Sequence, residues 1–179
     1  MNLKDMNFAD MPQKALIIIT KPSDYFKKMS KTGGFVEPLV FAMMMGLIGG
    51  IFQAVINVIG FGRYTGYGNG LIAGLSMIIK MPLYVGIGCF ICAAVFFLIW
   101  KFMGSQENYE TAVRCIAYLA ALVPLTTLVG AVPYGNILNT IIYVFYLVMV
   151  SVHAYNLPSQ KAWLVFGIIG AFYAIIGGW

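Results

Sequence analysis

Long apolar runs, more than any motif, limit what this chain can fold into. Residues 32–179 carry only eight charged side chains, whereas residues 1–31 carry nine, six of them lysine. Apolar residues make up 61% of the sequence and charged residues 9%, against about 45–50% and about 25% in soluble domains. A soluble globule could not cover so much apolar surface, so the sequence predicts an integral membrane protein with a polar N-terminal segment.

Five of the apolar runs are long enough to cross a bilayer as helices. A spanning helix needs about 20 apolar residues, because the hydrocarbon core is about 30 Å thick. The predicted fold class is therefore an all-α polytopic helical bundle. A basic interfacial segment occupies residues 1–35, and a five-span membrane domain occupies residues 36–179. The predicted spans are 38–61, 82–103, 112–132, 137–155 and 162–177.

Two prolines modify these predicted spans. Pro82 follows Lys80 inside the longest apolar run, and proline removes a helix hydrogen bond and disfavours helix before it. Residues 71–80 are therefore predicted to form a short helix of their own, either interfacial or half-inserted. Pro124 predicts a kink within the third span, and the Gly-rich sequence 62–70 predicts a turn.

The distribution of Lys and Arg predicts the orientation of the chain. With the N-terminus inside, nine of these residues fall on the cytoplasmic side and at most two on the other, as the positive-inside rule requires. Five spans then place the C-terminus outside. The only apolar run of the tail, residues 15–19, is too short for the core of a cleavable signal peptide. The net charge of +5 fits anionic lipid beside the spans better than nucleic acid.

The N-terminal segment has the signals of two short amphipathic helices. Asp10 ahead of Pro12 suits a helix start, and Pro22 ends that helix. A second helix follows, capped by Ser23 or Asp24. Aromatics beside lysines suit a helix lying on the membrane surface, as a lipid-binding surface or as a plain positive-inside anchor. The residues predicted to face lipid or headgroups are Lys21, Tyr25, Phe26, Lys27, Lys28, Lys31 and the snorkelling Lys80.

Three ionisable residues near the ends of spans are candidate site residues. Glu110 and Arg114 are four residues apart, which puts them on one helix face with the acid on the N-terminal side. They are predicted to form a structural ion pair or to line a ligand pocket. Glu37, at the entry to the first span, is a possible second partner for Arg114.

Polar residues inside the predicted spans can hydrogen-bond one helix to another or line a polar path through the membrane. Gln53 and Asn57 share a face of the first span, and Asn136 and Asn139 open the fourth; either pair can hydrogen-bond between helices. Gly46 and Gly50 form a GxxxG face that lets another helix approach, within the chain or in a dimer. His153, a lone histidine near the end of the fourth span, is predicted to be either a hydrogen-bonded structural residue or a metal ligand.

No sequence pattern indicates catalysis, a metal or a cofactor. Cys89 and Cys92 have CxxC spacing but lie in an apolar run without a second pair, so they read as small hydrophobic residues, like Cys115. The sequence contains no HExxH, no Ser–His–acid set and no paired intramembrane carboxylates. We therefore expect a protein that is not an enzyme and that needs no cofactor or metal.

Several short motifs follow one another in an order typical of a known family. KPSDYF (21–26) precedes the first span, and SQENYETAVR (105–114) follows the glycine at the end of the second. Ala117-Tyr118 and Pro124 lie in the third span, and VHAYNLPSQKA (152–162) joins the last two spans. Over roughly residues 15–178, most strongly 103–162, the chain resembles the Yip family of Ypt-interacting membrane proteins.

The resemblance implies five helices, a cytoplasmic N-terminus and no known chemistry. Eukaryotic members are associated with Rab-type GTPases and with vesicle traffic between endoplasmic reticulum and Golgi. Their cytoplasmic N-terminal region is usually much longer than the one here, which points to a prokaryotic member in a bacterial or archaeal plasma membrane. A small GTPase partner is implied by the family alone.

Two functions are compatible with these observations. The first is a non-enzymatic membrane-organising or adaptor protein whose basic N-terminus engages anionic lipid or a partner, including another copy of itself. The second is a small transporter, channel or lipid-handling protein that uses a broken segment at Lys80–Pro82 together with Glu37, Asn57 and Arg114.

Overall fold

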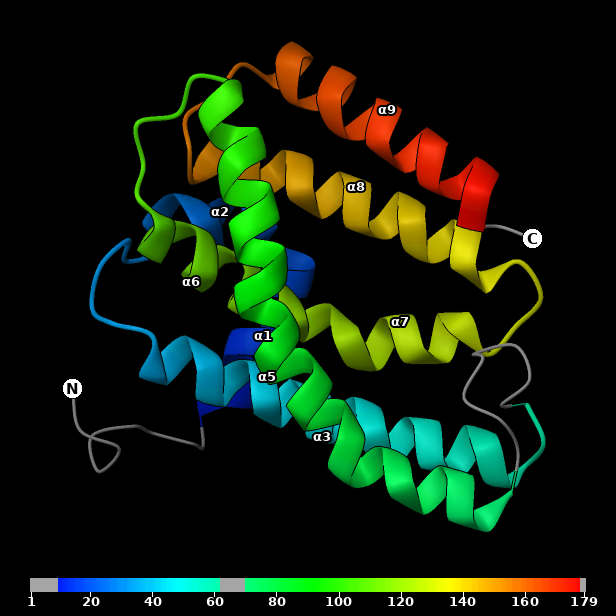
Figure 1. Ribbon diagram of the computed structural model, residues 1–179. Helices are drawn as coiled ribbons and strands as arrows, with labels where there is room; N and C mark the ends of the chain where they lie inside the picture. Colours follow the sequence, from blue (N-terminus) through cyan, green and yellow to red (C-terminus); the bar gives the residue numbers. More distant parts are fainter. Residues whose placement is uncertain (1–9, 62–69, 178–179) are drawn as a thin grey trace.

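The computed structural model describes residues 10–61 and 70–177, and within these ranges all regular elements are helices (Figure 1). Two short helices come first, and longer ones that run side by side follow. This arrangement confirms the predicted all-α bundle. The elements are α1 (Met11–Thr20), α2 (Pro22–Lys28), α3 (Val36–Val58), α5 (Leu71–Phe102), α6 (Tyr109–Leu119), the 3₁₀ turn η3 (Ala120–Leu122), α7 (Val123–Gly130), α8 (Gly135–His153) and α9 (Ser159–Gly177).

Five segments are long and apolar enough to cross a membrane: α3, α5, the α6–η3–α7 unit, α8 and α9. Their bounds lie within a few residues of the predicted spans, except at the start of α5. Many outward-facing side chains on them are apolar and exposed, such as Ile72 at 87% and Phe102 at 88%. Such a surface requires lipid around it. The predicted Gly-rich turn falls mostly in residues 62–69, outside the described residues.

Helices α3 and α5 form a tightly packed antiparallel hairpin, visible at the bottom of Figure 1. A Cβ added at Gly46 would lie 2.9 Å from the Cα of Pro82, and one at Gly50 would lie 2.6 Å from the Met77 carbonyl oxygen. Gly74 of α5 approaches the Ala54 carbonyl in the same way, at 2.8 Å. The small residues of the GxxxG face therefore bring together two helices of the same chain.

The prediction of a separate helix at 71–80 is wrong, because α5 continues through Lys80 and Pro82. A proline removes one hydrogen bond, but breaking the helix in an apolar run would leave several backbone groups without partners. At about 1.5 Å per residue, a helix of 32 residues exceeds the thickness of the hydrocarbon core. It must therefore tilt or project beyond the core. Lys80 is exposed on this helix.

The third span is interrupted where Pro124 predicts a kink. Helix α6 ends at Leu119, the 3₁₀ turn Ala120–Leu122 follows, and α7 starts at Val123. The proline ring clashes with the carbonyl of the residue four positions earlier, which is Ala120. The chain tightens to 3₁₀ geometry over this turn, so the kink prediction agrees with the structure.

The core lies around α6, whose residues Thr111–Cys115 and Ala117–Leu119 are all buried. Trp100 of α5 is fully buried beside it, donates from Nε1 to the Ser151 hydroxyl at 2.8 Å and stacks on Tyr155 at 4.2 Å between ring centroids. Lys161 at the start of α9 donates to the Met103 carbonyl oxygen at 2.6 Å. These contacts join the ends of α5, α8 and α9 at the end of the bundle where α6 begins.

Candidate functional site

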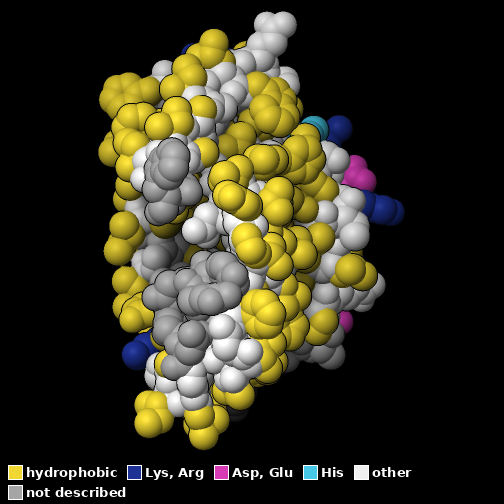
Figure 2. Space-filling view, turned by 90° about the vertical axis from the view of Figure 1, so that its right-hand side faces the viewer, with side chains coloured by type: hydrophobic (Ala, Val, Ile, Leu, Met, Phe, Trp, Pro, Cys, Tyr) yellow, Lys and Arg dark blue, Asp and Glu magenta, His cyan; other side chains and the backbone are white. Residues whose placement is uncertain are grey.

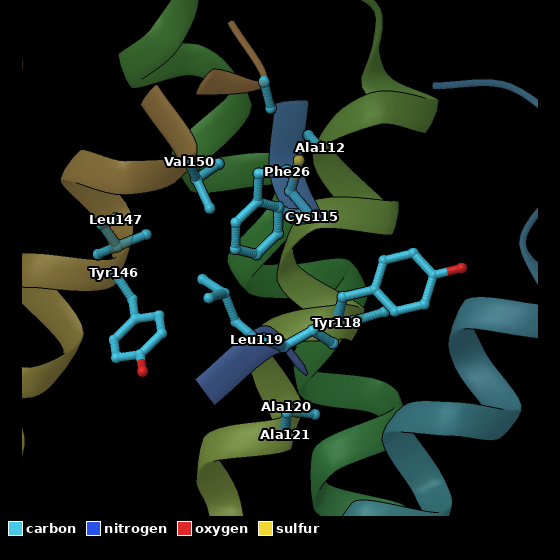
Figure 3. Close-up of a cluster of buried hydrophobic side chains, with 14 of the residues drawn as sticks. Phe26, Ala112, Cys115, Tyr118, Leu119, Ala120, Ala121, Tyr146, Leu147 and Val150 are labelled. Carbon is cyan, nitrogen blue, oxygen red and sulfur yellow. The ribbon is translucent and has the colours of Figure 1, made fainter. Parts of the chain in front are cut away.

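The N-terminal helices are docked into the bundle as part of its core. Ile18 and Phe26 have no exposed surface, and Met11 is 3% exposed. Figure 3 shows the Phe26 ring inserted between α6 and α8, with Cys115 on one side and Val150 on the other. The Tyr146 hydroxyl of α8 also donates to the Ile19 carbonyl oxygen at 2.6 Å. We call α1, α2 and residues 29–35 the basic collar.

The starts of both helices are close to those predicted. Helix α1 follows Asp10 with Pro12 in its first turn, as the sequence indicates. Helix α2 begins at Pro22, and Lys21 is the residue that precedes it. The prediction of Ser23 or Asp24 as its cap is wrong, because proline fits the first helical position and moves the start forward.

The predicted lipid-facing set divides into buried aromatics and exposed lysines. Phe26 is buried in the core, so its prediction as a lipid-facing residue is wrong. Tyr25 packs edge-on against Phe26 and Tyr118, each with 5.4 Å between ring centroids. Burial and the neighbouring Tyr118 raise the pKa of the Tyr25 phenol above its ordinary value, so this side chain stays neutral. Lys21, Lys27 and Lys28 are exposed, with no ion pair in the described part of the chain.

Arg114 fastens the segment between α2 and α3 to α6. Its side chain is almost completely buried, with 4% of it exposed. Nε donates to the Ser30 carbonyl oxygen and Nη1 to the Gly34 carbonyl oxygen, both at 2.8 Å. Nη2 lies 3.6 Å from a carboxylate oxygen of Glu37, so the predicted Glu37–Arg114 contact is present.

Glu37 is shared between two cations, and both of these cations also lie near the Tyr118 ring. Its other carboxylate oxygen accepts from Lys14 Nζ at 2.5 Å. The same Lys14 ammonium lies 5.4 Å from the centre of the Tyr118 ring, and the Arg114 guanidinium lies 5.9 Å from it. One carboxylate and one aromatic face thereby hold α1, α3 and α6 together.

The predicted Glu110–Arg114 ion pair is not formed among the described residues. Glu110 instead accepts a hydrogen bond from the Gly34 backbone N–H at 2.6 Å. The two residues therefore hold the same loop from opposite groups of Gly34, its N–H and its carbonyl. Helical spacing puts Glu110 and Arg114 on one face of α6. Each nevertheless hydrogen-bonds to the backbone of Gly34 and not to the other.

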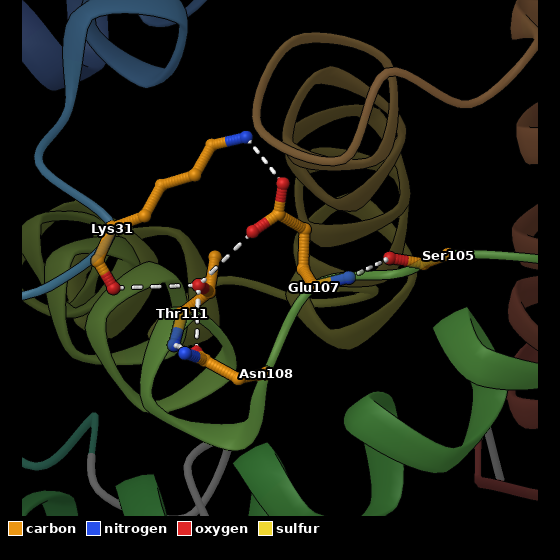
Figure 4. A network of polar contacts seen from close by, with 5 residues as sticks. All are labelled: Lys31, Ser105, Glu107, Asn108 and Thr111. Carbon is orange, nitrogen blue, oxygen red and sulfur yellow. Dashed lines mark hydrogen bonds and ion pairs between the residues drawn. The ribbon is translucent and has the colours of Figure 1, made fainter.

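A second polar network closes the start of α6 (Figure 4). Lys31 donates to Glu107 at 2.6 Å, and its carbonyl oxygen accepts from the Thr111 hydroxyl at 3.4 Å. The Asn108 side chain accepts from the Thr111 backbone N–H at 2.9 Å, which caps the helix. Lys31, predicted to face lipid headgroups, is thus engaged in an ion pair.

A surface hollow of about 580 Å³ opens between the collar and α6. Four cationic residues and two acids line it, so its side chains carry a net positive charge. Lys14, Lys21 and Lys28 line this hollow together, although the chain leaves helical geometry at Lys21, so helical spacing could not indicate their shared position. The ionisable residues of its wall are Lys14, Lys21, Lys28, Arg114, Asp24 and Glu37, with Tyr25 and Tyr118 beside them.

The remaining candidate residues lie away from this hollow. The Gln53 amide donates to the Asn57 side chain at 2.6 Å within α3, and both are buried. Twenty residues of helix separate Asn57 from Glu37, a rise of about 30 Å, so these two do not share a site. His153 is half-buried at the end of α8. Among the described residues, no group of three His, Cys, Asp or Glu could hold a metal ion.

A family model described as the Yip1 domain matches residues 16–179. No curated protein and no solved structure gives a significant match. The matched region includes the second half of α1, all of α2 and every candidate span, in agreement with the order of motifs seen in the sequence. The chain is therefore a multi-pass integral membrane protein that belongs to the Yip1 domain family.

Proposed function

We propose that the protein is a non-enzymatic membrane-organising protein whose basic collar holds the phosphate of an anionic lipid headgroup. The observation that carries the proposal is the collar hollow, into which α1 and α2 present Lys14, Lys21 and Lys28. Lysine is a strong point charge for phosphate. Lys14 and Arg114 are already engaged by Glu37, which leaves Lys21 and Lys28 as the principal phosphate ligands.

The docking of the collar supports a specific site over a loose basic tail. A disordered polybasic segment attracts anionic lipid through its total charge alone. Here Phe26 and Ile18 anchor the two helices, and Arg114 fixes the segment that follows them. The lysines of the hollow are thus carried by an ordered scaffold, which lowers the entropy lost when a headgroup binds.

We infer a cytoplasmic position for the collar, in a bacterial or archaeal plasma membrane. The positive-inside rule supports the first inference, since Lys101 and Lys161 lie near the same end of the bundle as the collar lysines. In this position the lysines face the anionic inner leaflet. Other membrane proteins, a second copy of the chain or a small GTPase would reach the protein through the same surface.

A lipid-retention experiment tests the proposal. The full chain is placed in nanodiscs containing phosphatidylglycerol and phosphatidylcholine, extracted, and weighed by native mass spectrometry with its retained lipids. Wild type should retain phosphatidylglycerol preferentially. The double variant Lys21→Gln/Lys28→Gln should lose that preference by roughly tenfold or more, at about 1 kcal/mol per lysine near a membrane surface.

Lys27→Gln is the matched control, because Lys27 is exposed on α2 but does not line the hollow. It should retain the preference for phosphatidylglycerol. A loss of binding free energy per lysine as large in the control as in the double variant would show that total charge, and not the hollow, attracts the lipid, which would overturn the proposal.

Transport is the weaker alternative. It depended on a broken helix at Lys80–Pro82 and on joint action of Glu37, Asn57 and Arg114. Helix α5 is continuous through Lys80 and Pro82, so it is not broken there. Glu37 and Asn57 lie about 30 Å apart along α3, so they cannot act together on one ion. Glu37 and Arg114 are also committed to holding the collar, which leaves them unsuited to release a transported ion.

A further inference from the structure

Two hollows lie at the end of the bundle away from the collar. These adjoining hollows of about 340 and 390 Å³ share Thr126 of α7 with Asn136, Asn139 and Tyr143 of α8. We call these four residues the polar cleft. The polar cleft lies near the turn between α7 and α8, at the right of Figure 1. Figure 2 shows the molecule from that side. Most side chains on this face are apolar or uncharged, and the charged ones lie towards its edges.

In the described part of the chain, Asn139 has one buried hydrogen-bond acceptor without a partner. Its Nδ2 donates to the Thr126 carbonyl oxygen at 2.9 Å, and a carbonyl can only accept, which fixes the orientation of the amide. The Oδ1 atom is buried and has no partner among the described residues. An unsatisfied buried acceptor is unfavourable, so the cleft favours a ligand that donates a hydrogen bond.

The neighbouring hydroxyls can complete such an interaction. Thr126 Oγ1 and Tyr143 Oη lie 3.5 Å apart, and the Thr126 hydroxyl donates back to the Leu122 carbonyl at 3.0 Å. With its only hydrogen on the Leu122 side, Thr126 Oγ1 accepts from the Tyr143 hydroxyl. The Tyr143 oxygen can then accept a hydrogen bond from a group held at Asn139. Two polar groups one helical turn apart on α8 thus face the same space.

The described lining of the cleft does not suit a charged headgroup. No Lys, Arg, His, Asp or Glu lines either hollow within the described chain. A phosphate or ammonium group would lie in an apolar surrounding without a counter-charge, which is costly. An uncharged hydroxyl meets the unpaired acceptor without that cost.

The larger of the two hollows also provides room for a hydrocarbon chain. Beyond Tyr143 it continues between α5, α8 and α9 along Phe96, Val144, Leu147 and Phe166. The site therefore has a hydrogen-bonding end and an apolar end, which is the shape of an amphiphile with a small head.

We propose that the polar cleft binds the free hydroxyl of an uncharged glycerolipid, a monoacylglycerol or diacylglycerol, with Asn139 Oδ1 accepting its hydrogen bond. Tyr143 holds the same head, and an acyl chain lies against Phe96 and Leu147. This site is separate from the collar hollow in position and in charge preference, and it does not depend on the proposed function.

The test uses 1-monooleoylglycerol as the probe, with methyl oleate as a matched chain that lacks a hydroxyl. Binding to the full chain in detergent is measured by native mass spectrometry and by competition with a photoreactive monoacylglycerol. Wild type should bind 1-monooleoylglycerol at least tenfold more tightly than methyl oleate. Asn139→Leu and Tyr143→Phe should each reduce that difference several-fold.

Tyr155→Phe is the control, because Tyr155 is buried but lines neither hollow, and it should bind as wild type does. Tyr143→Phe keeps the ring, so it decides the matter if Asn139→Leu fails to fold. Equal binding of the two probes, or unchanged preference in Tyr143→Phe, would overturn the proposal. Lys21→Gln/Lys28→Gln should leave this binding intact, which separates the cleft from the collar.

Discussion

Arg114 is the residue on which the attachment of the collar depends most. It satisfies two loop carbonyls and one carboxylate while almost fully buried. Arg114→Met should lower the free energy of unfolding by about 2–4 kcal/mol, because carbonyls and Glu37 lose a charged donor. Unfolding in mixed micelles monitored by tryptophan fluorescence measures this change.

Arg114→Lys should recover only part of that loss, since an ammonium cannot reach both carbonyls in the fixed fork of a guanidinium. Lys27→Met, at an exposed position of the same end, should change stability by no more than about 0.5 kcal/mol. Similar losses at positions 27 and 114 would contradict the role given to Arg114.

Spacing along a helix predicted which side chains share a face but not which partners they choose. Glu110 and Arg114 do lie one turn apart, yet both turn to the backbone of Gly34. The carbonyls of Ser30 and Gly34 are invisible to a reading of side chains, because every residue carries one. Lys14, Lys21 and Lys28 line one hollow, but the chain leaves helical geometry at Lys21, so their spacing in sequence could not predict this either.

The contact between α3 and α5 predicts opposite effects on stability when alanine replaces two different glycines. Gly50→Ala should destabilise the hairpin by about 1–3 kcal/mol, because its Cβ would meet the Met77 carbonyl at 2.6 Å. Gly88→Ala, in α5 with nothing within 4 Å of its added Cβ, should be neutral or stabilising by up to about 1 kcal/mol. Thermal unfolding of both variants tests the contact, and destabilisation of equal size would contradict it.

The docking of α2 gives a second prediction for an element. Phe26→Ala should cost about 3–5 kcal/mol, as expected for a fully buried phenylalanine. Phe102→Ala is the matched control, because that ring is 88% exposed at the end of α5, and it should cost far less. If Phe26 faced lipid, as its sequence surroundings suggested, the two substitutions would have similar effects in the same micelle.

Two prolines show where prediction of the elements from sequence ends. Apolar length predicted five segments that match the five candidate spans apart from the start of α5, since the bilayer imposes that length on any sequence. Pro124 follows a 3₁₀ turn, whereas Pro82 sits inside a continuous helix. The backbone at Pro82 rests against Gly46 of α3. A local sequence cannot report a contact made by a helix 36 positions earlier.

At the scale of the whole molecule, the charge distribution predicts one orientation in the membrane. In a variant without native cysteines, Tyr134→Cys in the exposed turn before α8 should react with an impermeant maleimide on intact cells. Lys27→Cys on the collar should react only after the membrane is opened. The reverse pattern would contradict a cytoplasmic collar.

The most direct test of the account is hydrogen–deuterium exchange of the full chain in nanodiscs, read at α1 and α2. A docked collar predicts slow exchange of both helices in phosphatidylcholine alone, with further protection when phosphatidylglycerol is added. Lys21→Gln/Lys28→Gln should keep the first protection and lose the second. Exchange as fast as that of an unstructured peptide, or protection that does not depend on the lipid, would contradict a folded collar that holds anionic headgroups.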